Sequence, residues 1–334
     1  MTGTNSDFDT DIVTLTRFLI QGQHKGATGD FTLLLNSLQF AFKHIAYNIR
    51  RSTLINLLGL SGTANSTGDD QKKLDVIGDD IFINAMKASG KVKLVVSEEQ
   101  EDLIVFDCNG RYAVVCDPID GSSNLDAGVS VGTIFGIYKL PDDSTGSIKD
   151  VLRPGRELVA AGYTMYGASA NLVLTMGTGR VDGFTLDDSL GEFILTHAEM
   201  KMPEHRAIYS VNEGNTMYWS DNARKYFESL KFPGEGKKPY SARYIGSMVA
   251  DMHRTILYGG IFAYPADSKS KQGKLRLLYE GNPMAMIIEQ AGGLAVNDEG
   301  KRILDLEPTQ IHQRSGIWLG SKGEVEKALK FLLP

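Results

Sequence analysis

Cysteine is scarce in this chain of 334 residues: only Cys108 and Cys116 are present, and neither belongs to a Cys/His pattern that binds zinc. Both lie in or beside apolar runs, so we expect buried thiols rather than a disulfide or a redox site. No apolar run approaches the ~20 residues of a membrane-spanning helix, and the polar, acidic N-terminus does not resemble a signal peptide. These absences favour a soluble, cytoplasmic protein that does not bind membranes.

An excess of positive charge is also missing. The chain has 35 Lys and Arg against 41 Asp and Glu, a net charge of -6, so bulk electrostatics give no reason to expect nucleic acid as a partner. Such a chain can still bind phosphate if it gathers its cations locally or uses metal ions. Its length and a hydrophobic content of 42% favour one large domain or two closely packed ones. We place a boundary near residue 200, between units 1–200 and 201–334.

Apolar periodicity predicts alternating helices and strand clusters, as in α/β or α+β layered folds. Helices are expected over about 12–20 and 31–49, and the Gly/Ser/Thr-rich segment 61–71 is expected to be a mobile loop, either functional or a solvated linker. A further helix is predicted at 191–198. Strand-like runs precede it at 92–97, 103–107, 112–117, 131–138, 157–166, 171–176 and 182–186. Helices in the second half are expected at 222–231, 247–258, 283–291 and 323–333.

The string DPIDGSSN (117–124) follows an apolar strand and is the most informative motif of the sequence. Asp117 and Asp120 supply carboxylates three residues apart, while Pro118 fixes the turn and Gly121 permits unusual backbone dihedrals. The small residues after the glycine can begin a helix or turn whose free N–H groups face an anion. Carboxylates for cations and amides for phosphate are therefore adjacent in one segment.

Further carboxylates come from Glu98 and Glu99, which follow the strand-like run 92–97, and from Glu280, which precedes a predicted helix. Adjacent carboxylates repel one another, which raises their pKa unless a cation is present. With the two aspartates they favour a site for hard divalent cations, because oxygen-only ligands suit Mg²⁺ or Mn²⁺ better than zinc. Two or more such ions can activate water and neutralise a phosphoryl group.

Cations gather late in the chain, in the segment KSKQGKLR (269–276) with its three lysines and one arginine. Arg243, Tyr244 and Tyr264 add planar and hydroxyl donors. Arginine suits bidentate phosphate binding, and lysine acts as a point charge. A solvated loop is the alternative interpretation, but the neighbouring YEGNP string (279–283) favours a binding site for a second phosphate group.

Together these strings closely resemble the eukaryotic type of fructose-1,6-bisphosphatase, within the lithium-sensitive, metal-dependent phosphatases that include inositol monophosphatase. DPIDGSS indicates the wider group, and ARYIGSMVADMHRT (242–255) with GKLRLLYE (273–280) narrows it to the fructose bisphosphatase branch. The resemblance runs from DIVTLTRF (11–18) to IHQR (311–314). It implies a sugar-phosphatase fold, a layered α/β (α+β) sandwich with alternating helix and sheet layers.

The resemblance also implies a reaction, the removal of the 1-phosphate of fructose 1,6-bisphosphate by metal-activated water, in gluconeogenesis. Asp75 and Glu99 resemble the pair that activates the water. Asp69 lies in a segment, 52–72, that resembles the family's mobile loop, and it resembles the residue that closes over the metal ions. The implied ligands of two or more Mg²⁺ ions, or of Mn²⁺, are Glu98, Glu99, Asp117, the carbonyl of Ile119, Asp120 and Glu280.

A substrate pocket follows from the same resemblance. Ser122 and Ser123 match the cradle of the 1-phosphate, and Arg243 matches an arginine that a neighbouring subunit contributes in a homotetramer, a dimer of dimers. Asn215 replaces a tyrosine that is frequent in the family, which puts affinity and sugar selectivity in question. The remaining implied contacts are Gly121 and Met248 to the sugar, and Asn212, Tyr244, Tyr264 and Lys274 to the retained 6-phosphate.

An inhibitory AMP site, far from the metal ligands, is implied as well. Free N–H groups at the start of the predicted helix 31–49 give a physical reason for anion binding there; a glycine-rich helix start without a ligand is the alternative. Asp30, Arg111 and Lys139 depart from the family's residues while keeping their charge, which we expect to alter AMP potency. The implied AMP contacts are Thr28, Gly29, Asp30, Phe31, Thr32, Arg111, Tyr112 and Lys139.

Two other functions stay open at this point. A related phosphatase for sedoheptulose bisphosphate or an inositol phosphate would share the metal site, although the basic segment 269–276 disfavours inositol monophosphate. A regulatory binding protein would keep the fold and the AMP site, but it would be expected to lose carboxylates at the metal site. All the candidate ligands are present in this sequence.

Overall fold

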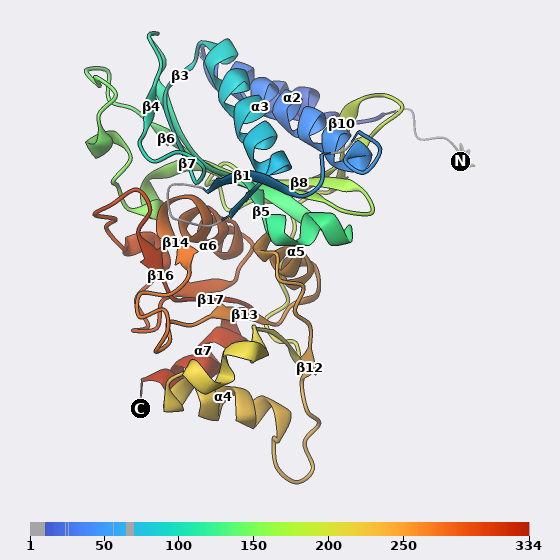
Figure 1. Cartoon of the computed structure of the whole chain (residues 1–334), viewed down its shortest axis with the longest axis vertical. Coiled ribbons are helices and arrows are strands. Elements are labelled where there is room, and N and C mark those ends of the chain that lie inside the picture. The colour runs from blue at the N-terminus through green and yellow to red at the C-terminus, as the bar shows by residue number, and fades with distance from the viewer. Residues whose placement is uncertain (1–10, 24, 26, 56, 65–69, 334) are drawn as a thin grey trace, which may run out of the picture.

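The computed structural model describes the chain except for residues 1–10, 24, 26, 56, 65–69 and 334. Helices and sheets alternate in layers (Figure 1), so the expected layered α/β sandwich is confirmed. In order, the layers are the helices α1 (Leu15–Gln21), α2 (Asp30–Arg51) and α3 (Lys73–Ser89), an eight-stranded sheet, the helices α5 (Met248–Tyr258) and α6 (Asn282–Gln290), a five-stranded sheet, and the helices α4 (Asp221–Lys231) and α7 (Lys322–Leu332).

The eight-stranded sheet has the order β10-β9-β8-β7-β6-β5-β3-β4. It is antiparallel except where β3 pairs with β5. Helices cover both of its faces, so a central strand such as β5 is buried along nearly its whole length. The strands are β3 (Val92–Ser97), β4 (Ile104–Val105), β5 (Tyr112–Asp120), β6 (Val131–Lys139), β7 (Leu158–Tyr166), β8 (Ala170–Thr175), β9 (Val181–Asp187) and β10 (Glu192–His197).

The last of these strands shows that the predicted helix at 191–198 was wrong. Residues 192–197 form β10, which pairs antiparallel with β9. On its other side, the N–H of Leu195 donates to the carbonyl of Val13, just before α1. The backbone groups of this segment are thus satisfied by partners distant in sequence, and local periodicity carries no information about them.

The segment 61–71, predicted to be a loop, begins and ends as strand. β1 (Leu60–Ala64) and β2 (Asp70–Lys72) pair antiparallel. β2 leads directly into α3, where the N–H of Lys72 donates to the Asp75 carboxylate at 2.7 Å. This contact caps the helix and fixes one of the predicted catalytic side chains at its first turn.

The N-terminal helices bury an apolar face on the eight-stranded sheet. Leu34, Leu38 and Phe42 of α2 are buried, and the Phe42 ring lies 5.4 Å from the ring of Phe135 on β6. These α2 positions are four apart and share one side of the helix. The helix predicted from this periodicity over 31–49 is therefore confirmed.

The five-stranded sheet, of order β12-β11-β13-β17-β15, forms the second half of the molecule. α5 and α6 separate it from the larger sheet, while α4 and α7 cover its outer face (Figure 1), where the Phe227 and Trp318 rings stack at 5.5 Å. The four helices predicted here are confirmed almost residue for residue. The strands are β11 (Ile208–Ser210), β12 (Ser241–Ala242), β13 (Ile261–Tyr264), β15 (Leu294–Val296) and β17 (Ile317–Gly320), beside a separate pair, β14 (Leu275–Arg276) and β16 (Arg314–Ser315).

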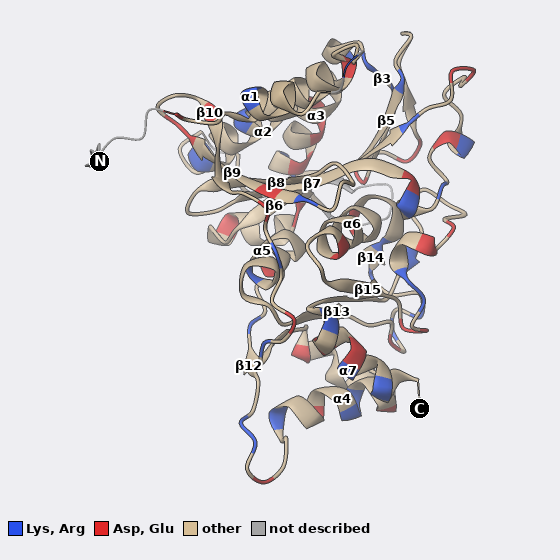
Figure 2. Cartoon of the chain, turned by 180° about the vertical axis from the view of Figure 1, so that it is seen from behind, with Lys and Arg blue, Asp and Glu red and all other residues tan. Residues whose placement is uncertain are grey.

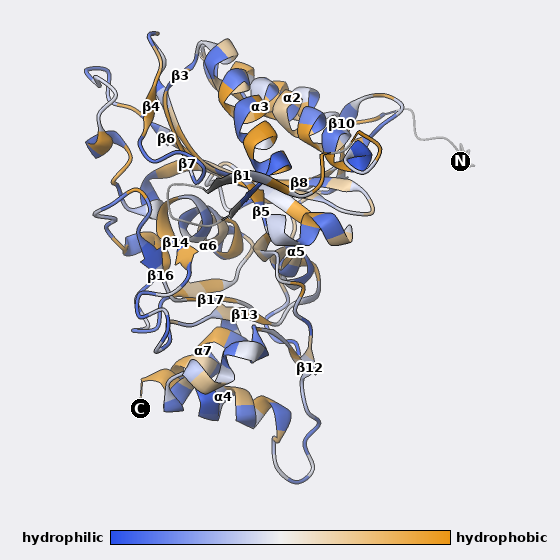
Figure 3. Cartoon of the chain, viewed as in Figure 1, coloured by the Kyte–Doolittle hydropathy of each residue, from blue (hydrophilic) through white to orange (hydrophobic). Residues whose placement is uncertain are grey.

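Charge and hydropathy follow this layering. Basic and acidic residues are interspersed over the outer helices (Figure 2), in keeping with a net charge of -6. Apolar and polar residues alternate along the outer helices (Figure 3), as expected when one side packs on a sheet. Among the described residues, no helix combines the length and the apolar character that a membrane crossing requires.

Candidate active site

Residues from both sheets and from the connections between them line one cavity of about 450 Å³. The end of β5 and the first turn of α3 border it on one side, and the segments around α5 and α6 border it on the other. The structure therefore gathers most of the predicted site residues in one place. Those that line the cavity are Asp75, Glu98, Glu99, Asp117, Ile119, Asp120, Gly121, Ser122, Ser123, Tyr244, Met248, Tyr264, Lys274 and Glu280.

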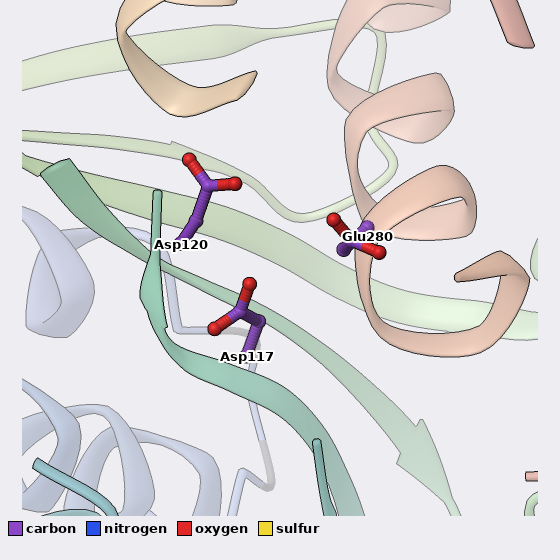
Figure 4. Close-up of side chains that lie close together, drawn as sticks. All are labelled: Asp117, Asp120 and Glu280. Carbon is purple, nitrogen blue, oxygen red and sulfur yellow. The ribbon is translucent and has the colours of Figure 1, made fainter. Parts of the chain in front are cut away.

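Three buried carboxylates meet at one end of this cavity. Asp117 and Asp120 extend from β5, and Glu280 faces them from the opposite side (Figure 4). One carboxylate oxygen from each lies within 4.8 Å of the others. Glu280 belongs to a π-helical turn, Leu277–Gly281, of a kind that is frequent at functional sites. The turn aims Glu280 at two residues that precede it by some 160 positions in the sequence.

Burial dominates the electrostatics of these three groups. It raises the pKa of Asp117 well above its ordinary value, and repulsion from Glu98 adds to the effect. The pKa of Glu280 rises well above its usual range for the same two reasons, and burial also raises the pKa of Asp120. An oxygen-only cluster that resists ionisation without a cation fits a hard divalent metal ion.

Asp120 is held by the start of α5. The Ser247 hydroxyl donates to its carboxylate at 2.8 Å, and the N–H of Val249 donates at 2.9 Å. Between these elements, Gly121 adopts φ 77°, a conformation that favours glycine. The end of β5 is thereby joined to the helix that begins the substrate side of the cavity.

The predicted catalytic pair lies at the same end. Burial raises the pKa of Glu99 to about 8, against a hydrogen bond from Gln71 and with repulsion from Asp75 and Glu98. Burial likewise raises the pKa of Asp75 to about 6, opposed by the N–H of Lys72 and by a hydrogen bond with Ser122. Without a bound cation, both carboxyl groups therefore titrate closer to neutral pH than an ordinary carboxyl group does.

The same cavity is also lined by a cation and two phenols. The Lys274 ammonium lies 5.8 Å from the centre of the Tyr264 ring, and Tyr244 lines the same region. The Asn215 amide donates to the Tyr264 hydroxyl at 3.2 Å. The residue that departs from the family's frequent tyrosine is therefore in contact with a side chain that lines the cavity.

Three predicted site residues do not line the cavity as described. Asn212 caps the short helix Glu213–Tyr218 and accepts from the N–H of Gly214. Arg243 is exposed and donates to the carbonyl of Ala242. Asp69 lies outside the described residues.

Sequence reasoning missed several residues that shape the site. Gln71 donates to Glu99, and Ser247 holds Asp120 as described above. Asp251 is fully buried and lines the cavity. A serine at the very start of the predicted helix 247–258 was an available signal for Ser247, because serine is favoured at the N-cap. The partners of Gln71 and Asp251 are set by tertiary contacts.

The residues expected to bind AMP lie together at another place, the start of α2 and the far ends of β5 and β6. Gly29 precedes α2 with φ 80°, and the Phe31 and Tyr112 rings are 5.6 Å apart. Tyr112 is paired with Lys139 across the two strands. Asp30 forms an ion pair with Lys91 at 2.7 Å.

This site and this fold define a phosphoric monoester hydrolase, an enzyme whose carboxylates and cations flank one cavity between two sheets. The sequence model of the fructose-1-6-bisphosphatase N-terminal domain matches residues 13–198, and that of the C-terminal domain matches residues 202–333. The chain belongs to the fructose-1,6-bisphosphatase family.

The similarity to known relatives extends over nearly the whole chain. The chain is 66% identical to fructose-1,6-bisphosphatase of Saccharomyces cerevisiae, covering 96% of this chain and 94% of that protein. It is 52% identical to the cytosolic fructose-1,6-bisphosphatase of Spinacia oleracea, covering 95% and 94%. A crystal structure of Leishmania major fructose-1,6-bisphosphatase in holo form superimposes with a TM-score of 0.91 at 48% identity, covering 96% of this chain and 99% of that one.

Proposed function

We propose that this enzyme hydrolyses fructose 1,6-bisphosphate to fructose 6-phosphate and phosphate. The observation that carries the proposal is that the buried Asp117, Asp120 and Glu280 cluster and Lys274 line one cavity. A substrate with two phosphates needs both: carboxylates that hold cations at the ester to be cleaved, and a fixed cation for the ester that is kept. The family relatives carry the same activity in their names.

The chain's own groups suit a direct attack by water. Asp75 and Glu99 line the cavity beside the carboxylate cluster, and an ionised carboxylate of this pair would take the proton of the attacking water as its oxygen bonds to phosphorus. The bond between phosphorus and the sugar oxygen O1 breaks, and O1 takes up a proton. Ser122 and Ser123 begin a helical turn beside the carboxylates and would orient the leaving phosphate.

Divalent cations are the implied cofactor, and we propose two or more Mg²⁺ ions per subunit, with Mn²⁺ as a substitute. The residues that would hold them are Asp117, Asp120, Glu280, Glu98 and Glu99, joined by the carbonyl of Ile119. Bound there, the ions would neutralise phosphoryl oxygens and lower the pKa of water. The donor set contains oxygen only, which supports this choice.

The reaction is tested by phosphate release from fructose 1,6-bisphosphate, sedoheptulose 1,7-bisphosphate and inositol 1-phosphate, each with Mg²⁺ and with a chelator. We expect Mg²⁺-dependent turnover that is fastest on the fructose ester. Asp120→Asn should abolish it, while the exposed Asp221→Asn should not. Faster turnover of another ester, with fructose 1,6-bisphosphate left intact, would assign the enzyme to a sibling activity.

We also propose that AMP binds at the start of α2 and inhibits the enzyme. Support comes from the proximity of Phe31 and Tyr112 and from the free N–H groups of the first turn, which favour a phosphate. Thr28, Gly29, Thr32, Asp30, Arg111 and Lys139 complete the proposed site. Asp30 already pairs with Lys91, so we expect Asp30 to organise the site through that pair. AMP titration of Tyr112→Ala, which should raise the inhibitory concentration without changing uninhibited turnover, tests the proposal.

The location of the enzyme, its assembly and the roles of its two units are a further part of the proposal. We propose a cytoplasmic homotetramer, a dimer of dimers, acting in gluconeogenesis, with residues 1–200 as the allosteric unit and 201–334 as the sugar-bisphosphate unit. Arg243 is exposed at the end of β12, which suits a contact with the site of a neighbouring subunit. Asn212 and Met248 would contribute to the sugar and 6-phosphate contacts, and Asp69 would close over the cations.

A further inference from the structure

His312 connects two segments that carry candidate metal ligands. It lies in the connection before β16, and its ring nitrogens face different elements. Nδ1 is 2.8 Å from the Tyr279 hydroxyl, and Nε2 is 3.0 Å from the carbonyl oxygen of Gln100. Tyr279 immediately precedes Glu280, and Gln100 immediately follows Glu99.

The partners fix the tautomer of the neutral ring. The carbonyl of Gln100, and that of Glu101 at 3.3 Å, can only accept, so Nε2 carries the hydrogen. Nδ1 is then an acceptor for the Tyr279 hydroxyl. The rings of Tyr279 and His312 also pack edge to face, with centroids 5.8 Å apart. A neutral imidazole thus satisfies a donor and an acceptor that belong to two different parts of the fold.

Both attachment points are themselves firmly held. Asp79 of α3 is buried and accepts from the Ser97 hydroxyl at 2.6 Å and from the Gln100 amide, so it clamps both ends of the turn that carries Glu98 and Glu99. Tyr279 is fully buried within the π-helical turn. A continuous hydrogen-bonded chain therefore runs from Asp79 through Gln100 and His312 to Tyr279.

This hydrogen-bonded chain crosses the side of the site where carboxylates repel one another. Glu98 and Glu99 line the same cavity as Asp117 and Glu280, so the turn after β3 lies close to the cluster. Repulsion tends to separate the two segments unless other contacts hold them. The His312 connection is such a contact, and His312 is not among the residues that line the cavity.

We propose that His312 is a positioning residue that sets the separation between the Glu98–Glu99 turn and Glu280, and thereby the affinity of the site for divalent cations. The inference rests on the proposed function only in assigning these carboxylates to cations. It adds a residue outside the ligand set whose loss acts on metal affinity rather than on sugar binding. Groups that orient metal ligands commonly contribute 10–100-fold to metal affinity, and we expect about 10-fold here.

The test uses variants that interrupt the hydrogen bonds of His312 on either side of its ring. Tyr279→Phe removes only the hydroxyl and keeps the ring. His312→Asn keeps an acceptor for Tyr279 and loses the donor to Gln100. The matched control is His205→Ala, since the His205 side chain is 65% exposed and pairs with carboxylates away from the cavity.

Binding of Mn²⁺ to the full-length protein, followed by electron paramagnetic resonance without substrate, is the first readout. Each variant should bind Mn²⁺ about 10-fold more weakly, and the double variant should be no worse than either single one, because a chain broken once no longer connects the segments. The Mg²⁺ concentration for half-maximal phosphate release should rise in step, with KM for the sugar ester and turnover at saturating Mg²⁺ nearly unchanged.

Unchanged Mn²⁺ affinity, with only a lower melting temperature, would reduce His312 to a packing residue and overturn the proposal. Strictly additive losses in the double variant would also overturn it, since the two bonds would then act separately. The Mn²⁺ readout needs no substrate. A protein that binds Mn²⁺ as expected but does not cleave fructose 1,6-bisphosphate would therefore contradict the proposed reaction and leave this inference standing.

Discussion

Gly121 and Ser247 approach each other so closely that no side chain fits between them. A Cβ atom on Gly121 would lie 2.6 Å from the Ser247 Cβ and 3.0 Å from its Cα. Ser247 is also the donor that holds Asp120. The contact therefore ties the candidate metal cluster to α5, where the substrate side of the cavity begins.

Gly121→Ala should therefore damage both stability and catalysis. The left-handed conformation costs about 1–2 kcal/mol for an alanine, and the clash with Ser247 adds about 1–3 kcal/mol. Gly128→Ala is the matched control, because Gly128 has φ 68° but open space around its Cβ position. Urea unfolding should show a larger loss for Gly121→Ala, with turnover falling at least 10-fold. Equal losses in the two variants would mean that the contact with Ser247 is unimportant.

Asp251 should control the pocket around Tyr244 without touching the substrate phosphates. Its carboxylate accepts from the N–H groups of Ile245 and Gly246 at 3.0 Å and from the Ser210 hydroxyl at 2.8 Å. Asp251→Asn places an amide donor against these donors, at a cost of about 1.5–3 kcal/mol.

The expected result for Asp251→Asn is a KM for fructose 1,6-bisphosphate about 10-fold higher, corresponding to about 1.4 kcal/mol, and a lower melting temperature. Asp221→Asn, with a side chain 81% exposed, serves as the control. Steady-state kinetics with an unchanged KM would show that the 243–247 segment keeps its position without the carboxylate.

Removal of divalent cations should destabilise the protein, and Asp117→Asn should reverse part of that loss. Burial and repulsion raise the pKa of Asp117, so its ionised form opposes folding when no cation is present; each pKa unit corresponds to about 1.4 kcal/mol. In a chelator at pH 7.5, Asp117→Asn should melt a few degrees above the parent protein. It should also lose the stabilisation that Mg²⁺ gives the parent protein.

Asp298→Asn is the control for Asp117→Asn, because Asp298 is a carboxylate that hydrogen-bond donors stabilise. Its carboxylate is half-buried, and it accepts from the Trp318 indole at 2.8 Å and from the N–H of Ala266 at 3.1 Å. Loss of this acceptor should lower the melting temperature whether or not Mg²⁺ is present. If calorimetry shows that Asp117→Asn behaves like Asp298→Asn, the cluster is not a site of electrostatic strain.

His253 should make the stability of the protein depend on pH. Its Nδ1 lies 2.9 Å from the Tyr163 hydroxyl, and burial, aided by His197, lowers the pKa of His253 from 6.5 to about 4. Between these values the unfolded chain binds the proton and the folded chain does not. The neutral ring therefore makes its full contribution to the free energy of unfolding above pH 6.5. This contribution is lost as the pH falls towards 4, by up to about 3 kcal/mol.

His253→Gln isolates this effect, because it keeps a polar side chain without a titrating group. The difference in unfolding free energy between the parent protein and His253→Gln should shrink as the pH is lowered from 7 to 4.5. Denaturant unfolding at several pH values measures it. Parallel curves for the two proteins across that range would contradict a buried, neutral His253.

Local sequence pattern was enough to predict several helices and strands and the type of chemistry at the site. A spacing of four residues between Leu34, Leu38 and Phe42 predicted α2, because an α-helix returns to the same face at that interval. The string DPIDGSSN, together with the neighbouring pair Glu98 and Glu99 earlier in the sequence, predicted a cation site from residue type alone. The family resemblance then supplied the reaction class, which the full-length matches support.

Which residues lie next to one another depends on contacts between segments that are distant in the sequence. Asp117 and Glu280 become neighbours through a π-helical turn that their own sequences do not signal. The segment 192–197 became strand β10 because β9 and Val13 supply its hydrogen-bond partners. Long-range contacts of this kind outweigh local propensity, since each buried backbone or charged group must find a partner wherever the fold provides one.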